Sequence, residues 1–100
     1  MRIEIRSRGL TLTKKQTLQL QQDVGFVFAR FGEKIGRVVV AVSASGSIGL
    51  RSCEIEVQLA PKPVTVVCTD RDVLVAVGYA ARRAARSVSR AIDLEELTRR

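Results

Sequence analysis

The chain begins with a strict alternation of apolar and charged residues over positions 2–6, which predicts a half-buried β-strand. Thr13 stands three residues before Gln16, the spacing of a capping box, so a helix is expected to begin there. Apolar residues then recur at helical spacing and predict the buried face of that helix: Leu20, Val24, Val27, Phe28 and Phe31. The helix should end near one of two glycines, Gly32 or Gly36.

Three further segments have the residue patterns of strands. The β-branched run 37–43 predicts a well-buried strand, and the alternating segments 53–59 and 64–69 predict half-buried strands. Residues 60–63, which contain both prolines, form a tight connection between the last two. Residues 44–50 are rich in glycine and serine, and we expect them to form the most mobile internal loop.

The C-terminal third of the chain predicts a second helix over residues 73–92, which residues 93–100 either extend or leave frayed. Thr69 or Asp70 can cap this helix, and Asp72 suits the positive end of the helix dipole. Its predicted buried face consists of Leu74, Val77, Ala81, Ala84 and Val88.

These elements predict one α+β domain over residues 1–100 with the order β-α-β-β-β-α. The first two strands are joined through a helix, which favours a parallel pair, and the following hairpins must be antiparallel. Because each strand has one apolar and one polar face, we expect a four-stranded mixed sheet with both helices on one side and solvent on the other.

The amino-acid composition then limits the classes of function that the chain can have. Seventeen Lys and Arg residues against ten Asp and Glu give a net charge of +7, which indicates an anionic partner, most commonly nucleic acid for a small basic domain. The chain has no His, which removes the usual general base and the commonest metal ligand. We therefore expect no enzyme activity, no cofactor, no metal and no small-molecule substrate. Aromatic residues make up only 4%, so a base-stacking platform is not expected either.

The N-terminal segment and the cysteines indicate a cytoplasmic protein without a membrane partner. Charges at every other position of residues 1–6 predict no signal peptide, and the longest apolar run, 38–42, is too short to cross a bilayer. Cys53 and Cys68 lie fifteen positions apart without a second pair, which is not a metal-binding pattern. Both are expected to be reduced core residues. A disulfide would need them on neighbouring strands and an oxidising compartment.

The second predicted helix carries the clearest functional signal, a set of four arginines that we call the arginine ridge. Arg83, Arg86 and Arg90 lie opposite the predicted buried face and Arg82 flanks them, with no acidic residue between positions 73 and 92. A solvated helix face normally mixes charges, because like charges four residues apart repel each other. Arg82 and Arg86 are such a pair, and so are Arg86 and Arg90. The pattern favours a surface that binds phosphate.

Four segments of the chain, in this order and spacing, resemble one known family. They are the opening strand with its turn and threonine cap (residues 1–13), Arg-Phe-Gly followed by Arg-Val-Val-Val (30–40), Cys-Glu-Ile-Glu-Val-Gln-Leu (53–59) and Thr-Asp-Arg-Asp-Val-Leu-Val-Ala-Val (69–77). Together they span nearly the whole chain and resemble the ribosome hibernation promoting factor and ribosome-associated inhibitor family.

The resemblance implies a small cytoplasmic, non-enzymatic protein that lies on small-subunit rRNA in the mRNA and tRNA channel and silences ribosomes under stress. It also implies a fold like that of double-stranded-RNA-binding domains. The rRNA-binding residues that it carries over are Arg8, Arg83, Arg86 and Arg90, with Arg37 as a further candidate. Because the chain ends at Arg100, we expect it to lack the dimerisation domain of the long form. A homo-oligomer is compatible with the resemblance but not implied.

The sequence departs from the family on the first helix, where family members are usually basic. Gln21, Gln22 and Asp23 stand there, and Gly25 is expected on the side of the helix opposite its buried face. Further departures are Leu74 in place of tyrosine, Arg82 at an often acidic position, and Glu54 and Gln58 on the third strand. They favour an alternative, a non-enzymatic protein-interaction or self-associating module that kept the fold but lost rRNA binding. A generic double-stranded-RNA binder is a third hypothesis, although Asp70 and Asp72 occupy the helix start where such domains carry lysines.

Overall fold

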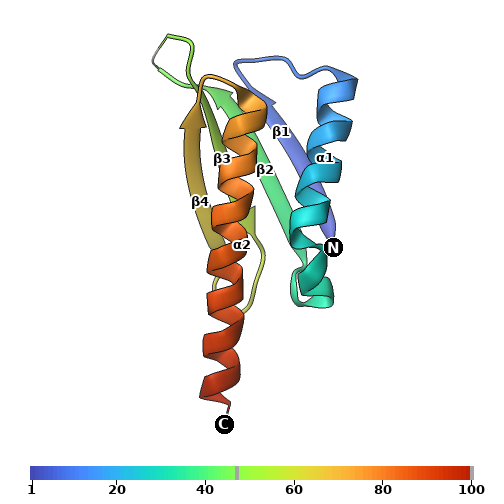
Figure 1. Ribbon diagram of the computed structural model, residues 1–100, viewed down its shortest axis with the longest axis vertical. Helices are drawn as coiled ribbons and strands as arrows, with labels where there is room; N and C mark the ends of the chain where they lie inside the picture. Colours follow the sequence, from blue (N-terminus) through green and yellow to red (C-terminus); the bar gives the residue numbers. More distant parts are fainter. Residues whose placement is uncertain (47, 100) are drawn as a thin grey trace.

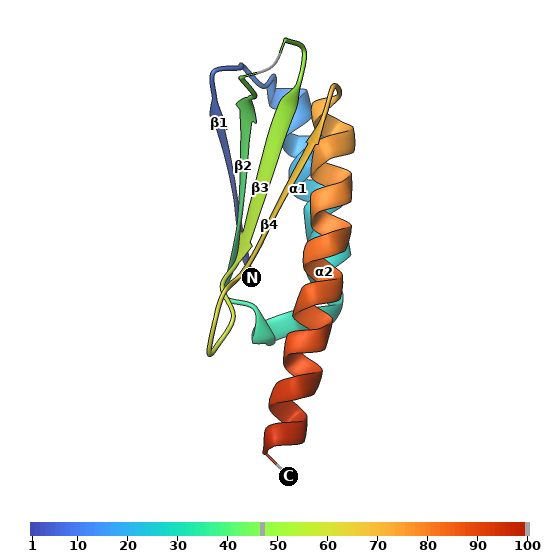
Figure 2. The same ribbon diagram turned by 90° about the vertical axis from the view of Figure 1, so that its left-hand side faces the viewer.

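The computed structural model describes residues 1–46 and 48–99 and arranges them in two layers (Figures 1 and 2). One layer is a sheet of four strands, β1 (Arg2–Arg8), β2 (Arg37–Ala44), β3 (Arg51–Val57) and β4 (Val64–Asp70). The other layer holds two helices, α1 (Lys14–Phe28) and α2 (Val73–Thr98), and the short 3-10 helix η1 (Ala29–Lys34) follows α1. The predicted α+β class and the β-α-β-β-β-α order are confirmed.

The strands lie in sequence order across the sheet, so that β1 and β4 form its two edges. β1 pairs with β2 in parallel, whereas β2 with β3 and β3 with β4 are antiparallel, as predicted. The third strand begins and ends two residues earlier than the predicted 53–59, because its ladder with β2 runs from Arg51 to Val57. Both helices cover the same face of the sheet, and the other face is open (Figure 2).

The first helix begins where the sequence predicts it. The Thr13 hydroxyl accepts a hydrogen bond from the Gln16 backbone N–H, and the Gln16 side chain accepts one from the Thr13 N–H, each over 3.0 Å. The end of this helix differs from the prediction, since α1 stops at Phe28 and the chain continues as η1. Gly32 lies within η1 with a φ of 55°, a conformation that favours glycine and breaks the helical path.

The expectation that Gly25 lies away from the core is wrong. A Cβ atom at this position would meet the Ile3 side chain of β1 at 3.3 Å. Gly25 is three residues before the buried Phe28, so it shares the margin of the buried face instead of opposing it. The missing side chain lets α1 lie close to the edge strand β1.

Small residues on the buried face of α2 let this helix pack closely against the sheet. The buried residues of α2 are Ala76, Val77, Ala80, Ala81, Ala84, Ala85 and Val88. Leu74, predicted to belong to this face, is 41% exposed, which corrects the prediction. In the first turn Val73 is half-buried and Ala76 buried in its place, because the helix meets the sheet through a face rotated toward these positions.

The N-cap of α2 differs from the predicted one, and the helix extends past residue 92. The N-cap is Asp72, whose carboxylate accepts a hydrogen bond from the Leu74 N–H over 2.8 Å, and not Thr69 or Asp70. Asp70 instead accepts from the Asp72 N–H and holds the preceding turn. At its other end α2 continues through Thr98 and projects past the sheet (Figure 1).

The predicted loop 44–50 is shorter in the structure, because Ala44 still pairs with Arg51 at the end of β2. The Ser45 N–H donates to the Leu50 carbonyl over 3.1 Å and closes the loop. Ser47 lies outside the described residues, and so does Arg100 at the C-terminus. The mobility of this loop stays a prediction.

Candidate nucleic-acid interface

The arginine ridge lies on the solvent side of α2, opposite the alanine-rich face that contacts the sheet. All four of its side chains are exposed, as predicted. Within residues 1–46 and 48–99 the ion pairs involve other cations, so no carboxylate neutralises the ridge. The ridge therefore presents four uncompensated positive charges over about two and a half turns of helix.

The contacts that the ridge does make hold its guanidinium groups in place without cancelling their charge. Arg82 lies over the Tyr79 ring, 5.4 Å from the ring centroid. Arg83 reaches β4 and donates to the Val67 carbonyl over 3.5 Å and to the Cys68 sulfur over 3.4 Å. Arg90 donates to the Ser87 hydroxyl over 3.4 Å. Because all these partners are neutral, each guanidinium keeps further N–H groups for an external anion.

An open groove of about 620 Å³ separates the ridge from the free edge of the sheet. Its lining residues come from two elements: Val67, Cys68 and Thr69 of β4, and Tyr79, Arg82, Arg83 and Arg86 of α2. Three of the four ridge arginines thus face one concave surface beside an edge strand. Such a surface can hold an extended anionic chain, with planar guanidinium groups that form paired hydrogen bonds to phosphate.

The structure places Arg8 and Arg37 on the other side of the molecule. Both belong to the polar face of β1 and β2, since Ile3 and Val38 point toward the helices. Arg8 is exposed at the end of β1 and lines a hollow of about 440 Å³ together with Arg6 and Glu54. The six predicted binding residues therefore form two groups on opposite faces, four on α2 and two on the open sheet.

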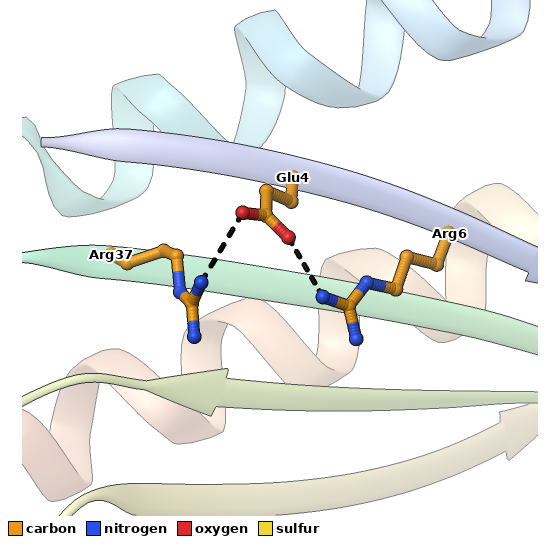
Figure 3. A network of polar contacts seen from close by, with 3 residues as sticks. All are labelled: Glu4, Arg6 and Arg37. Carbon is orange, nitrogen blue, oxygen red and sulfur yellow. Dashed lines mark hydrogen bonds and ion pairs between the residues drawn. The ribbon is translucent and has the colours of Figure 1, made fainter.

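Arg37 belongs to a small charge network that the sequence analysis missed. Glu4 lies between two arginines and pairs with Arg6 over 2.9 Å and with Arg37 over 3.4 Å (Figure 3). Arg37 is half-buried, and Glu4 partly neutralises its charge. This makes Arg37 a weaker anion ligand than the members of the ridge. The parallel register Arg2↔Arg37, which brings Glu4 within reach, could be inferred only after the strand pairing was known.

The sequence analysis also missed the pairing of the two cysteines. Cys53 and Cys68 are direct partners in the β3–β4 register, and both side chains lie on the helix side of the sheet. A signal was present, because a hairpin centred between Ala60 and Pro61 places residues 53 and 68 opposite each other. Burial, and secondarily the nearby Cys68 and Glu54, raises the pKa of the Cys53 thiol to about 12. Cys53 is therefore protonated at neutral pH.

We expect the two thiols of the reduced protein to differ sharply in reactivity. Under native conditions at pH 8, an alkylating reagent should modify Cys68, which is half-buried and lines the groove, and leave the fully buried Cys53 unmodified. Denaturation should expose both. Mass spectrometry of the peptides measures each site. Equal labelling of both cysteines in the native reduced protein would contradict this expectation.

Among the described residues, no helix is both long and apolar enough to cross a bilayer. In the same part of the chain, no three His, Cys, Asp or Glu side chains come together in a way that could hold a metal ion.

Comparison with known proteins identifies the fold. No family model and no curated protein matches the sequence. The N-terminal domain of Thermus thermophilus Protein Y matches with a TM-score of 0.75 and 24% identity, over 90% of this chain and 98% of that one. A ribosomal subunit interface protein from Coxiella burnetii matches with a TM-score of 0.80 and 11% identity, over 93% of this chain and 99% of that one. The chain therefore has the fold of these two proteins, which confirms at the level of the fold the resemblance seen in the sequence.

Proposed function

We propose that this chain is a non-enzymatic ribosome-binding protein that silences translation and contacts small-subunit rRNA through the arginine ridge. The observation that carries the proposal is the ridge itself, four exposed arginines without a carboxylate partner among the described residues. A helix accepts the repulsion between like charges at this spacing only at a cost in stability, so a binding role accounts for it better than solvation does. The fold supports the same partner, because one structural neighbour is named a ribosomal subunit interface protein.

The geometry suggests how the ridge would engage rRNA. Arg82, Arg83 and Arg86 line the groove beside β4, and Arg90 continues the same face one turn further along α2. Consecutive guanidinium groups along a helix match the repeated phosphates of an RNA backbone, and such contacts position a protein without reading sequence. Arg8, on the open face of the sheet, would need a second RNA segment, as expected for a protein inserted in an rRNA-lined channel. Occupying the mRNA and tRNA path would block translation sterically, without catalysis.

The alternative hypothesis, an interaction module that kept the fold but lost rRNA binding, has its own support on α1. Phe26 is 85% exposed and Leu18 is 59% exposed on this helix, where the family resemblance implies basic residues. A contiguous patch of exposed apolar side chains marks a surface that contacts proteins, and on this hypothesis Leu18 and Phe26 would contribute to such a patch. This hypothesis predicts a protein partner, or a second copy of the chain, at α1.

Co-sedimentation with purified ribosomal subunits separates the two hypotheses. The proposal predicts that the chain pellets with small subunits at moderate salt, is released at high salt, and fails to pellet with large subunits alone. Phe26→Ala should leave this binding unchanged. If the chain stays in the supernatant with both subunits, or if Phe26→Ala abolishes the interaction while the arginine ridge is dispensable, the interaction-module hypothesis becomes the better account.

A further inference from the structure

The two cysteines are neighbours in the sheet, and burial in the core alone would not require them to be. Cys53 and Cys68 are direct partners on adjacent antiparallel strands, with both side chains on the helix side of the sheet. Partner residues in such ladders have Cα atoms about 4.5–5.5 Å apart, which lies inside the range of about 4.4–6.8 Å found for disulfides. The strand register therefore places the two cysteines within the Cα separation that a cross-strand disulfide requires.

The two sulfurs differ in their exposure to solvent, and this difference gives each one a separate role. Cys68 is half-buried on the edge strand and lines the open groove, so a small oxidant can reach its sulfur from solvent. Cys53 is fully buried on the neighbouring strand, so its sulfur is shielded from solvent. An accessible thiol beside a shielded one is the arrangement of a peroxide-reactive cysteine and its resolving partner.

Arg83 places a positive charge beside the Cys68 sulfur. Its guanidinium donates to the Cys68 sulfur over 3.4 Å and faces the same groove. A positive charge at this distance stabilises the negative charge on sulfur as it attacks a peroxide. Of the ridge residues, Arg90 does not line the groove, which makes it a matched control of the same type on the same helix.

We propose that Cys53 and Cys68 form a reversible oxidation site at which a peroxide converts the two thiols into a cross-strand disulfide. Cys68, as its thiolate, attacks one oxygen of hydrogen peroxide, the O–O bond breaks, and the displaced hydroxide takes up a proton and leaves as water. The product is a sulfenic acid on Cys68. Cys53 then loses its proton and attacks that sulfur, the S–O bond breaks, and a second water leaves. The two thiols have given two electrons to the peroxide, and a dithiol reductant returns them.

The test is treatment of the purified chain with hydrogen peroxide, followed by intact-mass and peptide mass spectrometry. The expected product is a monomer that has lost two hydrogen atoms, with one peptide link between Cys53 and Cys68, and dithiothreitol should restore the starting mass. Cys53→Ala should instead accumulate a sulfenic acid on Cys68 that a dione probe traps. Cys68→Ala should give neither product.

The arginine variants test the role of the groove. Arg83→Ala should slow disulfide formation roughly three- to tenfold, whereas Arg90→Ala should leave the rate unchanged. Oxidation of wild-type Cys68 to sulfinic acid with Cys53 still a thiol, or a disulfide that links two chains through Cys68, would overturn the proposal. Equal rates for the two arginine variants would overturn the role of Arg83. None of these readouts depends on ribosome binding, so the inference and the proposed function can fail independently.

Discussion

Replacing Arg83, Arg86 and Arg90 together by alanine is expected to weaken ribosome binding roughly 100-fold at moderate salt, if each charge-assisted contact contributes about 1 kcal/mol. The physical reason is that these side chains are exposed and carry charge that no carboxylate of the described residues balances. The measurement is the dissociation constant of a labelled chain for purified small subunits, compared with that of the wild type.

The fold of the triple variant should be intact. Substitution of an exposed side chain usually changes the free energy of unfolding by no more than about 0.5 kcal/mol. Loss of the like-charge pair Arg86 and Arg90 acts in the stabilising direction. The hydrogen bonds that Arg83 and Arg90 donate are too long for their loss to offset this by much. A melting temperature well below that of the wild type would show that the ridge has a structural role instead.

A charge-matched control separates the ridge from net charge. Lys15, Arg30 and Lys62 are exposed and lie outside the ridge, on α1, on η1 and between β3 and β4. Replacing these three by alanine lowers the net charge from +7 to +4, because 7 − 3 = 4, as the ridge variant does. We expect this control to bind ribosomes within a few-fold of the wild type. Equal losses in the two triple variants would mean that binding follows overall charge and not the ridge.

The second large effect concerns stability, and we expect Phe28→Ala to lower the free energy of unfolding by about 3–5 kcal/mol. Phe28 is fully buried at the end of α1, and its ring centroid lies 6.2 Å from that of Phe31. Removing the ring leaves a cavity between α1 and the rest of the core, and the loss is a large fraction of the stability of a typical small domain. Urea unfolding followed by circular dichroism measures the change.

Phe26 provides the matched control on the same helix. It is the same residue type two positions earlier and is 85% exposed. Phe26→Ala should therefore change the free energy of unfolding by less than about 0.5 kcal/mol. If both substitutions destabilise the protein equally, Phe26 is buried in solution by a contact that a single chain does not make. Self-association is then the first explanation to test.

The sequence predicted the elements well where a pattern has one physical meaning. The alternation around Ile3 and Ile5 can only be a strand with one buried face, and the Thr13–Gln16 spacing predicts a helix start that the structure confirms. Leu74 shows the limit of this reasoning. It fits the helical period, but which part of a broad apolar face is buried depends on how the helix is rotated against the sheet. That rotation is set by tertiary packing of the small residues that follow.

One part of the candidate site was predictable from the sequence and another part was not. The like-charge spacing of Arg82, Arg86 and Arg90 identified the exposed side of α2 from the sequence alone. The groove beside it was not predictable, because it needs β4 at the edge of the sheet and Arg83 within reach of Cys68. These are distances between elements far apart in the chain, and no local pattern encodes them.

The salt dependence of ribosome binding tests the central claim most directly. Each phosphate that a protein cation neutralises adds about 0.7–0.9 to the slope of log K against log salt concentration. We predict a steep slope for the wild-type chain, lower by about two to three units in the Arg83, Arg86 and Arg90 triple variant and nearly unchanged in the Lys15, Arg30 and Lys62 control. A ridge variant that binds small subunits with the affinity and slope of the wild type would contradict the account.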